Sequence, residues 1–400
     1  PPPEIYTNTE SSAASDVYKR QVLTGLPEHA HRYTFGMPPL TERMGERTYP
    51  VLLRRAGYRT GFVGKLGVKV APGYADAAFD TFVPLALGRS WREQPDGSRR
   101  HRTDLVGDAA LEFLEGARDG RPFCLSVSFN AGHAVDGDLV DHYPWPPAED
   151  GLYEDVELPL PRLGAPEDYQ ALPPFLRRSM GRVRYGWRWD TPEKYDRNLR
   201  AYYRLLTGMD RNVGRLLDAL DHLGLADTTL VLFMGDNGYA MAERGLAGKW
   251  THFEESLRVP LIARGPGVAR GRIEPRMALN IDLAPTVLAA CGLPVPSGTE
   301  GVSLAPLLRG DEAVAWRDGF RCEHGFDPGN IPRWVGYRTG RWKYARYVDQ
   351  VPPWEALHDL AADPHERENL VRSPEHAGVL AELRAASLAA GPPLRAPFED

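Results

Sequence analysis

The sequence predicts an α/β protein with a mostly parallel, mixed sheet sandwiched by helices and a small antiparallel C-terminal subdomain. Two apolar runs of strand length, at 122–130 and 228–235, are typical of strands covered on both faces. Between them, residues 195–223 repeat apolar side chains at three- and four-residue steps, which indicates an amphipathic helix. Strand, helix and strand in alternation favour parallel pairing with helices on both faces of the sheet.

Shorter signals predict further elements of the same class. The stretch 58–65 reads Tyr-Arg-Thr-Gly-Phe-Val-Gly-Lys and predicts a strand that ends near Lys65. Asp104 and Asp282 each precede an apolar periodic stretch, where a short carboxylate side chain commonly caps a helix. These elements belong to the same sheet-and-helix domain.

The chain is expected to divide into four parts. Residues 1–21 have no apolar period and include a run that resembles translated adapter sequence, so we interpret them as a non-native or disordered segment outside the core. A catalytic α/β domain is expected over 22–319, with a long substrate-side insertion at 134–192. A small C-terminal subdomain is expected over 320–400, where two aromatic runs around 339–340 predict a hairpin.

Composition excludes several classes of function. The 400 residues carry a net charge of −6, which gives no basis for nucleic-acid binding. The sequence contains no run of about 18 apolar residues, so it predicts no membrane span. The three cysteines are too scattered for a disulfide framework or a zinc motif, and we interpret them as small core residues with a lesser possibility of one disulfide.

The strongest local pattern follows the second apolar strand. Asp236 and Asn237 come directly after Gly235, at the end of a strand where ligands of parallel sheets gather. A carboxylate beside an amide oxygen suits Ca²⁺ or Mg²⁺, and Gly238 permits the turn that aims both side chains. Lys249 is placed to hold an anionic substrate. The alternative is an ordinary Asp-Asn-Gly turn with a surface lysine.

This pattern resembles the sulfatase family. The stretch 235–267 matches a family block in which an Asp-Asn or Asp-His pair precedes a Gly-Glu-x-Gly-Leu-x-Gly-Lys run and then an Arg-Val-Pro-Leu-Ile strand. Further stretches match the family in its order, and together they cover about residues 22 to 370. These stretches are 22–32, 48–65, 128–133, 280–310 and 357–370.

The resemblance implies an alkaline-phosphatase-like fold and a site for sulfate-ester hydrolysis. Asp236 and Asn237 would be two ligands of one divalent ion, Ca²⁺ with Mg²⁺ or Mn²⁺ as alternatives. Lys65 and Lys249 would contact the sulfate oxygens, and His133 would bind the oxyanion or protonate the leaving group. A small-molecule or carbohydrate sulfate ester is the implied substrate. Family analogy points to a periplasmic or secreted protein, while the oligomeric state is left open.

The chain departs from the family pattern at three places. Gly67 stands where the family has a histidine that supports the nucleophile, and Gly132 replaces the usual proline before His133. The family's Cys (or Ser)-x-Pro-x-Arg motif, whose first residue becomes formylglycine, is also absent. Counting back from the Leu-Thr-Gly run reaches Ser15, with Lys19 at the arginine position, and we interpret this Ser15 as a coincidence.

These departures leave three functions open. The first is a sulfuric ester hydrolase that uses a divalent metal ion and, in its intact form, formylglycine. The second is a phosphodiesterase or phosphonate monoester hydrolase of the same superfamily, which the missing histidine slightly favours. The third is a catalytically dead binding protein with the same fold. Because both the nucleophile motif and the family's Asp-Asp metal ligands are missing, the chain as given is expected to be inactive.

Overall fold

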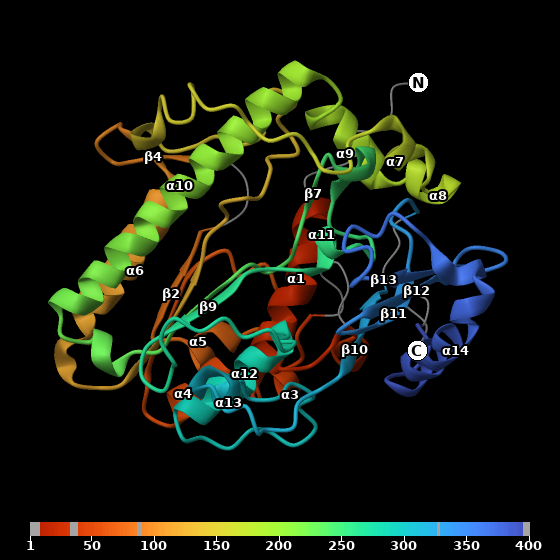
Figure 1. Cartoon of the computed structure of the whole chain (residues 1–400). Helices are drawn as coiled ribbons and strands as arrows, with labels where there is room; N and C mark the ends of the chain where they lie inside the picture. The colour runs from red at the N-terminus through yellow and green to blue at the C-terminus, as the bar shows by residue number, and fades with distance from the viewer. Residues whose placement is uncertain (1–8, 33–38, 86–89, 326–328, 395–400) are drawn as a thin grey trace.

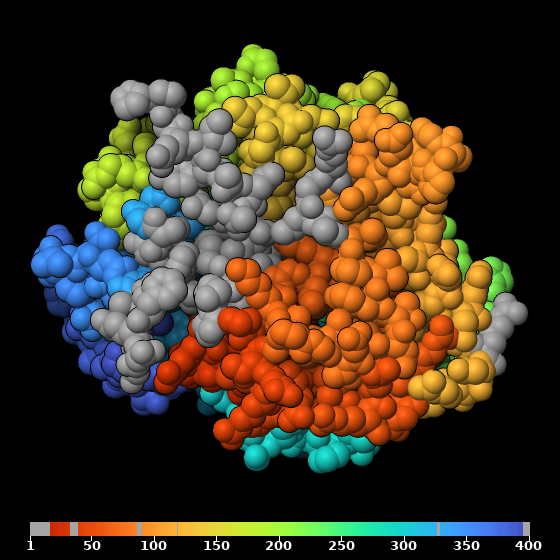
Figure 2. Space-filling view, turned by 180° about the vertical axis from the view of Figure 1, so that it is seen from behind, coloured from red at the N-terminus to blue at the C-terminus, as the bar shows by residue number. Residues whose placement is uncertain are grey.

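The α/β class is confirmed by a computed structural model that describes residues 9–32, 39–85, 90–325 and 329–394. A parallel sheet lies between helical layers, and an antiparallel sheet with one long helix forms the C-terminal side of the molecule (Figure 1). Figure 2 shows the molecule from behind, with the C-terminal region in blue at the left edge. In the described ranges, no helix is both long and apolar enough to cross a bilayer. All three cysteines are free thiols.

Three parallel strands form one part of the sheet. The central strand β1 (Arg59–Gly64) lies between β2 (Thr81–Pro84) and β5 (Phe123–Ser128). In the register, Phe62 of β1 is opposite Phe82 on one side and Ser126 on the other. The strand predicted before the first candidate lysine is therefore confirmed.

One helical layer covers this sheet with two long helices. These are α6 (Arg102–Glu115) and α10 (Pro192–His222), which run side by side in Figure 1. Phe113 of α6 packs so closely over Gly61 of β1 that a Cβ at Gly61 would lie 2.6 Å from its ring. Glycine at this strand position therefore lets the helix approach the sheet.

The start of α6 differs from the prediction. His101, not Asp104, caps the helix: its ring Nδ1 accepts a hydrogen bond from the Thr103 N–H at 3.3 Å. Asp104 lies inside the first turn and accepts hydrogen bonds from Arg211 and Asn212 of α10, at 2.8 and 2.9 Å. The carboxylate has a tertiary partner, so it joins the two helices instead of capping one.

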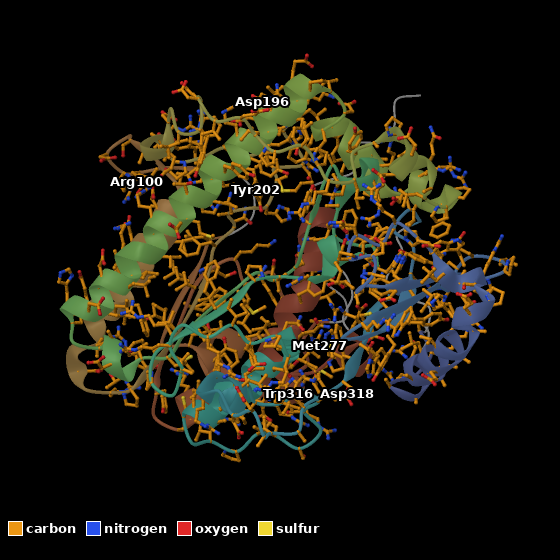
Figure 3. All side chains as sticks on the ribbon, viewed as in Figure 1. Arg100, Asp196, Tyr202, Met277, Trp316 and Asp318 are labelled. Atoms are coloured by element: carbon orange, nitrogen blue, oxygen red, sulfur yellow. The ribbon has the colours of Figure 1, made fainter. Side chains whose placement is uncertain are left out.

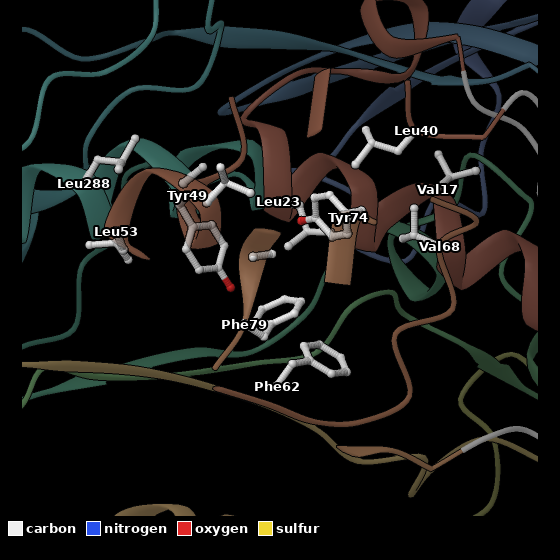
Figure 4. Packing of buried hydrophobic residues seen from close by; sticks show 13 residues of the cluster. Val17, Leu23, Leu40, Tyr49, Leu53, Phe62, Val68, Tyr74, Phe79 and Leu288 are labelled. Carbon is white, nitrogen blue, oxygen red and sulfur yellow. The ribbon is translucent and has the colours of Figure 1, made fainter. Parts of the chain in front are cut away.

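The opposite helical layer carries the main apolar cluster. It contains α4 (Tyr49–Arg55) and α12 (Leu283–Ala290), which meet Phe62 on the other face of β1 (Figure 4). Asp282 precedes α12 as predicted, but its carboxylate accepts hydrogen bonds from the Leu279 N–H and from a nearby arginine. The helix is present, while the predicted side-chain cap is not.

The expectation that residues 1–21 lie outside the core is wrong for the described part of that segment. Helix α1 (Thr9–Thr24) runs through the middle of the molecule and packs on α12 (Figure 1). Val17 is 4% exposed and belongs to the apolar cluster with Leu23 (Figure 4). Arg20 is fully buried. The polar composition of the segment conceals one apolar helix face whose burial depends on the other helices.

The two strands that flank the site are only half-buried, which corrects the prediction that both are fully covered. β5 pairs with β1 alone, and β6 (Val231–Met234) pairs antiparallel with β9 (Leu261–Arg264) alone, among the strands of the described residues. A cavity of about 1330 Å³ runs along both strands, between α10 and α12. Strands suited to complete burial therefore face an open space.

The C-terminal subdomain is a four-stranded antiparallel sheet with strand order β10-β11-β12-β13. The predicted hairpin at 339–340 is confirmed by the pairing of β11 with β12. The elements of this subdomain are β10 (Gly319–His324), β11 (Trp334–Thr339), β12 (Trp342–Tyr347), β13 (Trp354–Asp359) and α14 (Ala377–Ala389).

Short elements complete the described chain and lie in loops around the two sheets. The helices among them are α2 (Glu28–His31), α3 (Glu42–Gly45), α5 (Tyr74–Ala78), α7 (Pro166–Gln170), α8 (Pro174–Arg177), α9 (Met180–Arg188), α11 (Glu254–Leu257) and α13 (Ala305–Arg309). The strands among them are β3 (Trp91–Glu93), β4 (Arg99–His101), β7 (Ala240–Met241) and β8 (Ala247–Gly248).

Packing of α1 can be tested with one buried and one exposed valine. Val17→Asp places an unpaired carboxylate in the apolar cluster and is expected to lower the free energy of unfolding by ~3–5 kcal/mol. Val351→Asp is the matched control, because Val351 is 99% exposed, and its effect is expected within ~0.5 kcal/mol. Urea unfolding followed by circular dichroism measures both. Equal stability of the two variants would contradict the packing of α1.

Candidate functional site

The sequence-predicted site residues line one cavity. Lys65 follows β1, His133 lies in the loop after β5, and Asp236 with Asn237 follows β6. Lys249 reaches the same cavity from the segment after β8. The carboxyl ends of β1 and β5 in the parallel sheet, and of β6 in the two-stranded sheet beside it, therefore open onto the same cavity, the kind of place where ligands of α/β proteins gather.

One hydrogen bond and one ion pair connect these groups. Lys249 Nζ donates a hydrogen bond to Asn237 Oδ1 at 3.1 Å. On the other side, Lys19 Nζ lies 3.2 Å from Asp236 Oδ2. Both oxygen donors of the predicted metal pair are thus held by ammonium groups. Lys65 and Lys249 are themselves 4% exposed, whereas the side chain of Asp236 is 38% exposed to the cavity.

The carboxylate of Asp236 stays ionised in this setting. Burial raises the pKa of Asp236, but the ammonium groups of Lys19, Lys249 and Lys65 together lower it by more. The net pKa lies below the ordinary value for aspartate. Three cations around one carboxylate leave an excess of positive charge at the end of the sheet, which favours an anionic ligand.

Two glycines allow the backbone to bring these side chains together. Gly64 has φ 107°, and a Cβ there would lie 2.1 Å from the Ser128 carbonyl, so only glycine lets β1 end directly beside β5. A Cβ at Gly238 would lie 2.2 Å from the Glu255 carbonyl. The turn after Asn237 can therefore pack against the α11 segment only because residue 238 has no side chain.

His133 has a defined orientation. Its ring Nδ1 donates a hydrogen bond to the Ala134 carbonyl at 2.8 Å, since a carbonyl can only accept. The other ring nitrogen, Nε2, is then the one that can exchange a proton with a ligand. Gly132, which stands in place of the family's proline, has φ 88°. Proline, whose ring fixes φ near −65°, cannot adopt this conformation before His133.

Lys19 is a site residue that the sequence interpretation missed. It extends from α1 into the cavity, where it pairs with Asp236. Its distance from Gly25 places it at the family's arginine position, and that spacing is the available signal. Because the sequence interpretation treats the whole segment 1–21 as non-native or disordered, it does not use this spacing to assign Lys19 to the site. Ser15 lies on the same helix, four residues earlier.

The described residues fit part of a calcium site. Ca²⁺ takes six to eight oxygen ligands, and Asp236 with Asn237 offers hard oxygens of the required kind. Asp136, a further carboxylate that lines the cavity, is instead engaged by two arginines of α9: Arg184 at 2.8 Å, and Arg188. Asp236 and Asn237 are therefore two donors of the larger set that a calcium ion needs.

The aromatic side chains of the 134–192 insertion mostly serve as core. Tyr143 and Trp189 are 1% and 2% exposed and pack with the start of α10. Tyr202 of α10, which is labelled in Figure 3, and Tyr239, two residues after Asn237, line the cavity near the candidate residues, but both lie outside the insertion. The aromatic side chains of the insertion could form a wall that binds a sugar, or could simply pack the loop. Tyr143 and Trp189 pack the loop.

Most of the chain matches two protein-family models. Residues 5–293 match the family model described as Sulfatase. Residues 242–390 match the model described as the C-terminal part of N-sulphoglucosamine sulphohydrolase. The first match alone covers more than half of the chain, and the second spans the C-terminal antiparallel sheet.

Two curated relatives extend over most of the chain. An N-acetylglucosamine-6-O-sulfatase of Bacteroides thetaiotaomicron is 25% identical over 449 residues, covering 93% of this chain and 76% of the relative. A choline-sulfatase of Rhizobium meliloti is 33% identical over 362 residues, covering 82% of this chain and 67% of the relative.

Two solved structures share the fold. A phosphonate monoester hydrolase from Silicibacter pomeroyi superposes with a TM-score of 0.77 at 23% identity, covering 93% of this chain and 85% of that chain. A protein solved with its substrate D-glucosamine-2-N,6-O-disulfate superposes with a TM-score of 0.74 at 22% identity, covering 95% and 88%. At these identities the likeness concerns the fold alone.

The positive end of the sheet makes anion binding testable without turnover. Lys249→Gln and Lys65→Gln each remove one buried ammonium group and are expected to weaken binding of inorganic sulfate by about tenfold. Lys194→Gln is the control, because Lys194 pairs with Asp190 on the outer surface of α10. Isothermal titration at low ionic strength measures all three. Equal affinities in the three variants would contradict this site.

Proposed function

The chain belongs to the sulfatase family, and we propose that its cavity binds a sulfate ester and that the intact protein hydrolyses it. The observation that carries the proposal is the convergence of Lys19, Lys65 and Lys249 around Asp236 at the carboxyl end of the sheet. Sulfate-ester hydrolysis increases negative charge on the sulfuryl and leaving-group oxygens. Ammonium groups that are already fixed in position stabilise that charge without reorganising.

Each side chain has a proposed role. Lys65 and Lys249 hold the non-bridging oxygens of the sulfuryl group. His133, whose Nδ1 is fixed on a carbonyl, gives a proton from Nε2 to the alcohol oxygen that leaves. The S–O bond to that oxygen breaks, water supplies the new oxygen on sulfur, and the products are an alcohol and hydrogen sulfate.

The ion and the nucleophile are the finer parts of the proposal. We assign Asp236 and Asn237 to a Ca²⁺ ion, with Mg²⁺ or Mn²⁺ as alternatives, because their donors are a carboxylate and an amide oxygen. When bound, such an ion polarises the sulfuryl oxygens. Formylglycine, when present, supplies the nucleophile. Its motif is missing from this sequence, so the chain as given binds the ester without turning it over.

A phosphonate monoester is the second candidate substrate class. The fold of the Silicibacter pomeroyi hydrolase supports it, and sulfate and phosphonate monoesters each carry a single negative charge that the same lysines would hold. The curated relatives at 25% and 33% identity are sulfatases, which favours the sulfate ester. A binding protein without turnover remains the third candidate.

Turnover is tested by restoring the motif. The chain as given is expected to release no 4-nitrophenol from 4-nitrophenyl sulfate. The triple variant Ser15→Cys, Val17→Pro, Lys19→Arg is co-expressed with a formylglycine-generating enzyme. Because Val17 is buried inside α1, proline at this position weakens the helix, so circular dichroism first selects the conditions under which the variant is folded. The folded variant is expected to release 4-nitrophenol slowly, and to lose this activity with Asp236→Ala. Mass spectrometry of the peptide with residue 15 verifies conversion of the introduced cysteine.

The competing candidates give different outcomes in the same assay. Faster release from 4-nitrophenyl phenylphosphonate than from the sulfate would replace the main proposal by the second. Complete conversion of the introduced cysteine to formylglycine with no release from either ester, together with Lys249-dependent sulfate binding, would favour the binding protein. Multiple turnovers by the unaltered chain would contradict the assigned need for the motif.

A further inference from the structure

A second group of metal-ligand side chains lies away from the cavity, where the Lys249 segment meets the C-terminal sheet. His252 comes just before α11, His358 lies in β13, and Glu366 lies in the loop after β13. All three are buried, and their ligand atoms lie within 4.8 Å of one another. Three groups with compatible ligand atoms, from two segments that are distant in the sequence, therefore share one enclosed space.

The two imidazoles face each other with their Nε2 atoms 3.3 Å apart. Nδ1 of His358 donates to the Glu368 carbonyl at 2.8 Å, so in the neutral ring Nε2 carries a lone pair. Two nitrogens bound to one tetrahedral Zn²⁺, each at ~2.0–2.1 Å, lie about 3.3–3.4 Å from each other.

The outer partners also fit metal-binding histidines. Such histidines usually donate their second ring N–H to a carbonyl, carboxylate or similar oxygen, which fixes the ring. His358 Nδ1 has the Glu368 carbonyl, and His252 Nδ1 has the Tyr347 hydroxyl at 3.0 Å. Glu366 is held in the left-handed backbone region, at φ 53°, where a side chain other than glycine is strained.

We propose that His252, His358 and Glu366 bind one Zn²⁺ ion that joins the C-terminal sheet to the segment carrying Lys249. Two imidazoles and one carboxylate are a ligand set that suits zinc, whereas Ca²⁺ prefers oxygen donors alone. The site is distinct from the Asp236 and Asn237 pair in both position and chemistry, and it does not rest on the proposed sulfate-ester activity.

Nearby charges determine how the ion is accommodated. Lys343, fully buried, lies 2.5 Å from Glu366 Oε1 and 3.1 Å from Glu254 Oε1. The other oxygen of Glu366 accepts the Glu254 backbone N–H at 2.7 Å. A zinc ion takes Oε1 of Glu366 in place of Lys343, while Lys343 keeps its contact with Glu254, which Arg338 also binds. The ion therefore exchanges one partner of Glu366 without leaving Lys343 unpaired.

The site has a mechanical consequence. His252 lies three residues after Lys249, and His358 belongs to the last strand of the C-terminal sheet. A metal bond between them fixes the segment that presents Lys249 to the cavity. Because the unfolded chain does not hold the three ligands together, bound zinc also stabilises the fold.

The experiment measures metal on the whole folded chain. After treatment with a chelating resin, the protein is loaded with Zn²⁺ or Co²⁺, and metal content is determined by mass spectrometry. We expect one zinc per chain, a raised melting temperature, and, with Co²⁺, the intense visible absorption of a tetrahedral site. His252→Gln and His358→Gln are expected to lose the absorption band and at least tenfold in zinc affinity.

The control is another buried histidine. His142→Gln alters a ring whose nitrogens face the Val135 and Trp187 carbonyls, far along the chain from the cluster, and it is expected to keep full zinc binding. The unaltered chain failing to bind zinc, or giving octahedral cobalt spectra, would overturn the proposal even if the variants do not fold. Equal zinc affinity in His142→Gln, His252→Gln and His358→Gln would overturn it as well.

Discussion

The attraction between one carboxylate and three ammonium groups organises the end of the parallel sheet. Asp236 pairs with Lys19 at 3.2 Å, and Lys65 and Lys249 also lower its pKa. These groups come from α1, β1, β6 and the segment after β8, so their meeting requires the strands to end at one edge. Separate lysines so little exposed would repel one another, and Asp236 offsets part of that repulsion.

The cavity beside this cluster is larger than a typical ligand site. Typical small-molecule pockets measure ~300–1,000 Å³, whereas the space along β5 and β6 is about 1330 Å³ and is lined mainly by apolar side chains. The candidate residues line the polar end of the cavity. The rest of the cavity, which is apolar, separates the sheet that contains β5 from the sheet that contains β6. The gap leaves Phe123–Ser128 and Val231–Met234 half-buried, although their composition suits strands covered on both faces.

The C-terminal sheet contributes to the site through the segment that follows Lys249. Trp334 of β11 donates its indole N–H to the Trp250 carbonyl at 2.9 Å, and His252 stacks near His358 of β13 with ring centroids 5.4 Å apart. Arg338 and Lys343 both bind Glu254 at the start of α11. The subdomain therefore holds the backbone around Lys249 in place from behind.

The sequence alone determined the fold class, the strand before Lys65, the long helix α10 and the C-terminal hairpin, because apolar periodicity and turn residues act locally. It also identified five residues that line one cavity. Only the tertiary structure decided that Val17 is buried, that Asp104 binds α10 instead of capping α6, and that Lys19 meets Asp236. Each of these depends on a partner distant in sequence, whose position no local pattern contains.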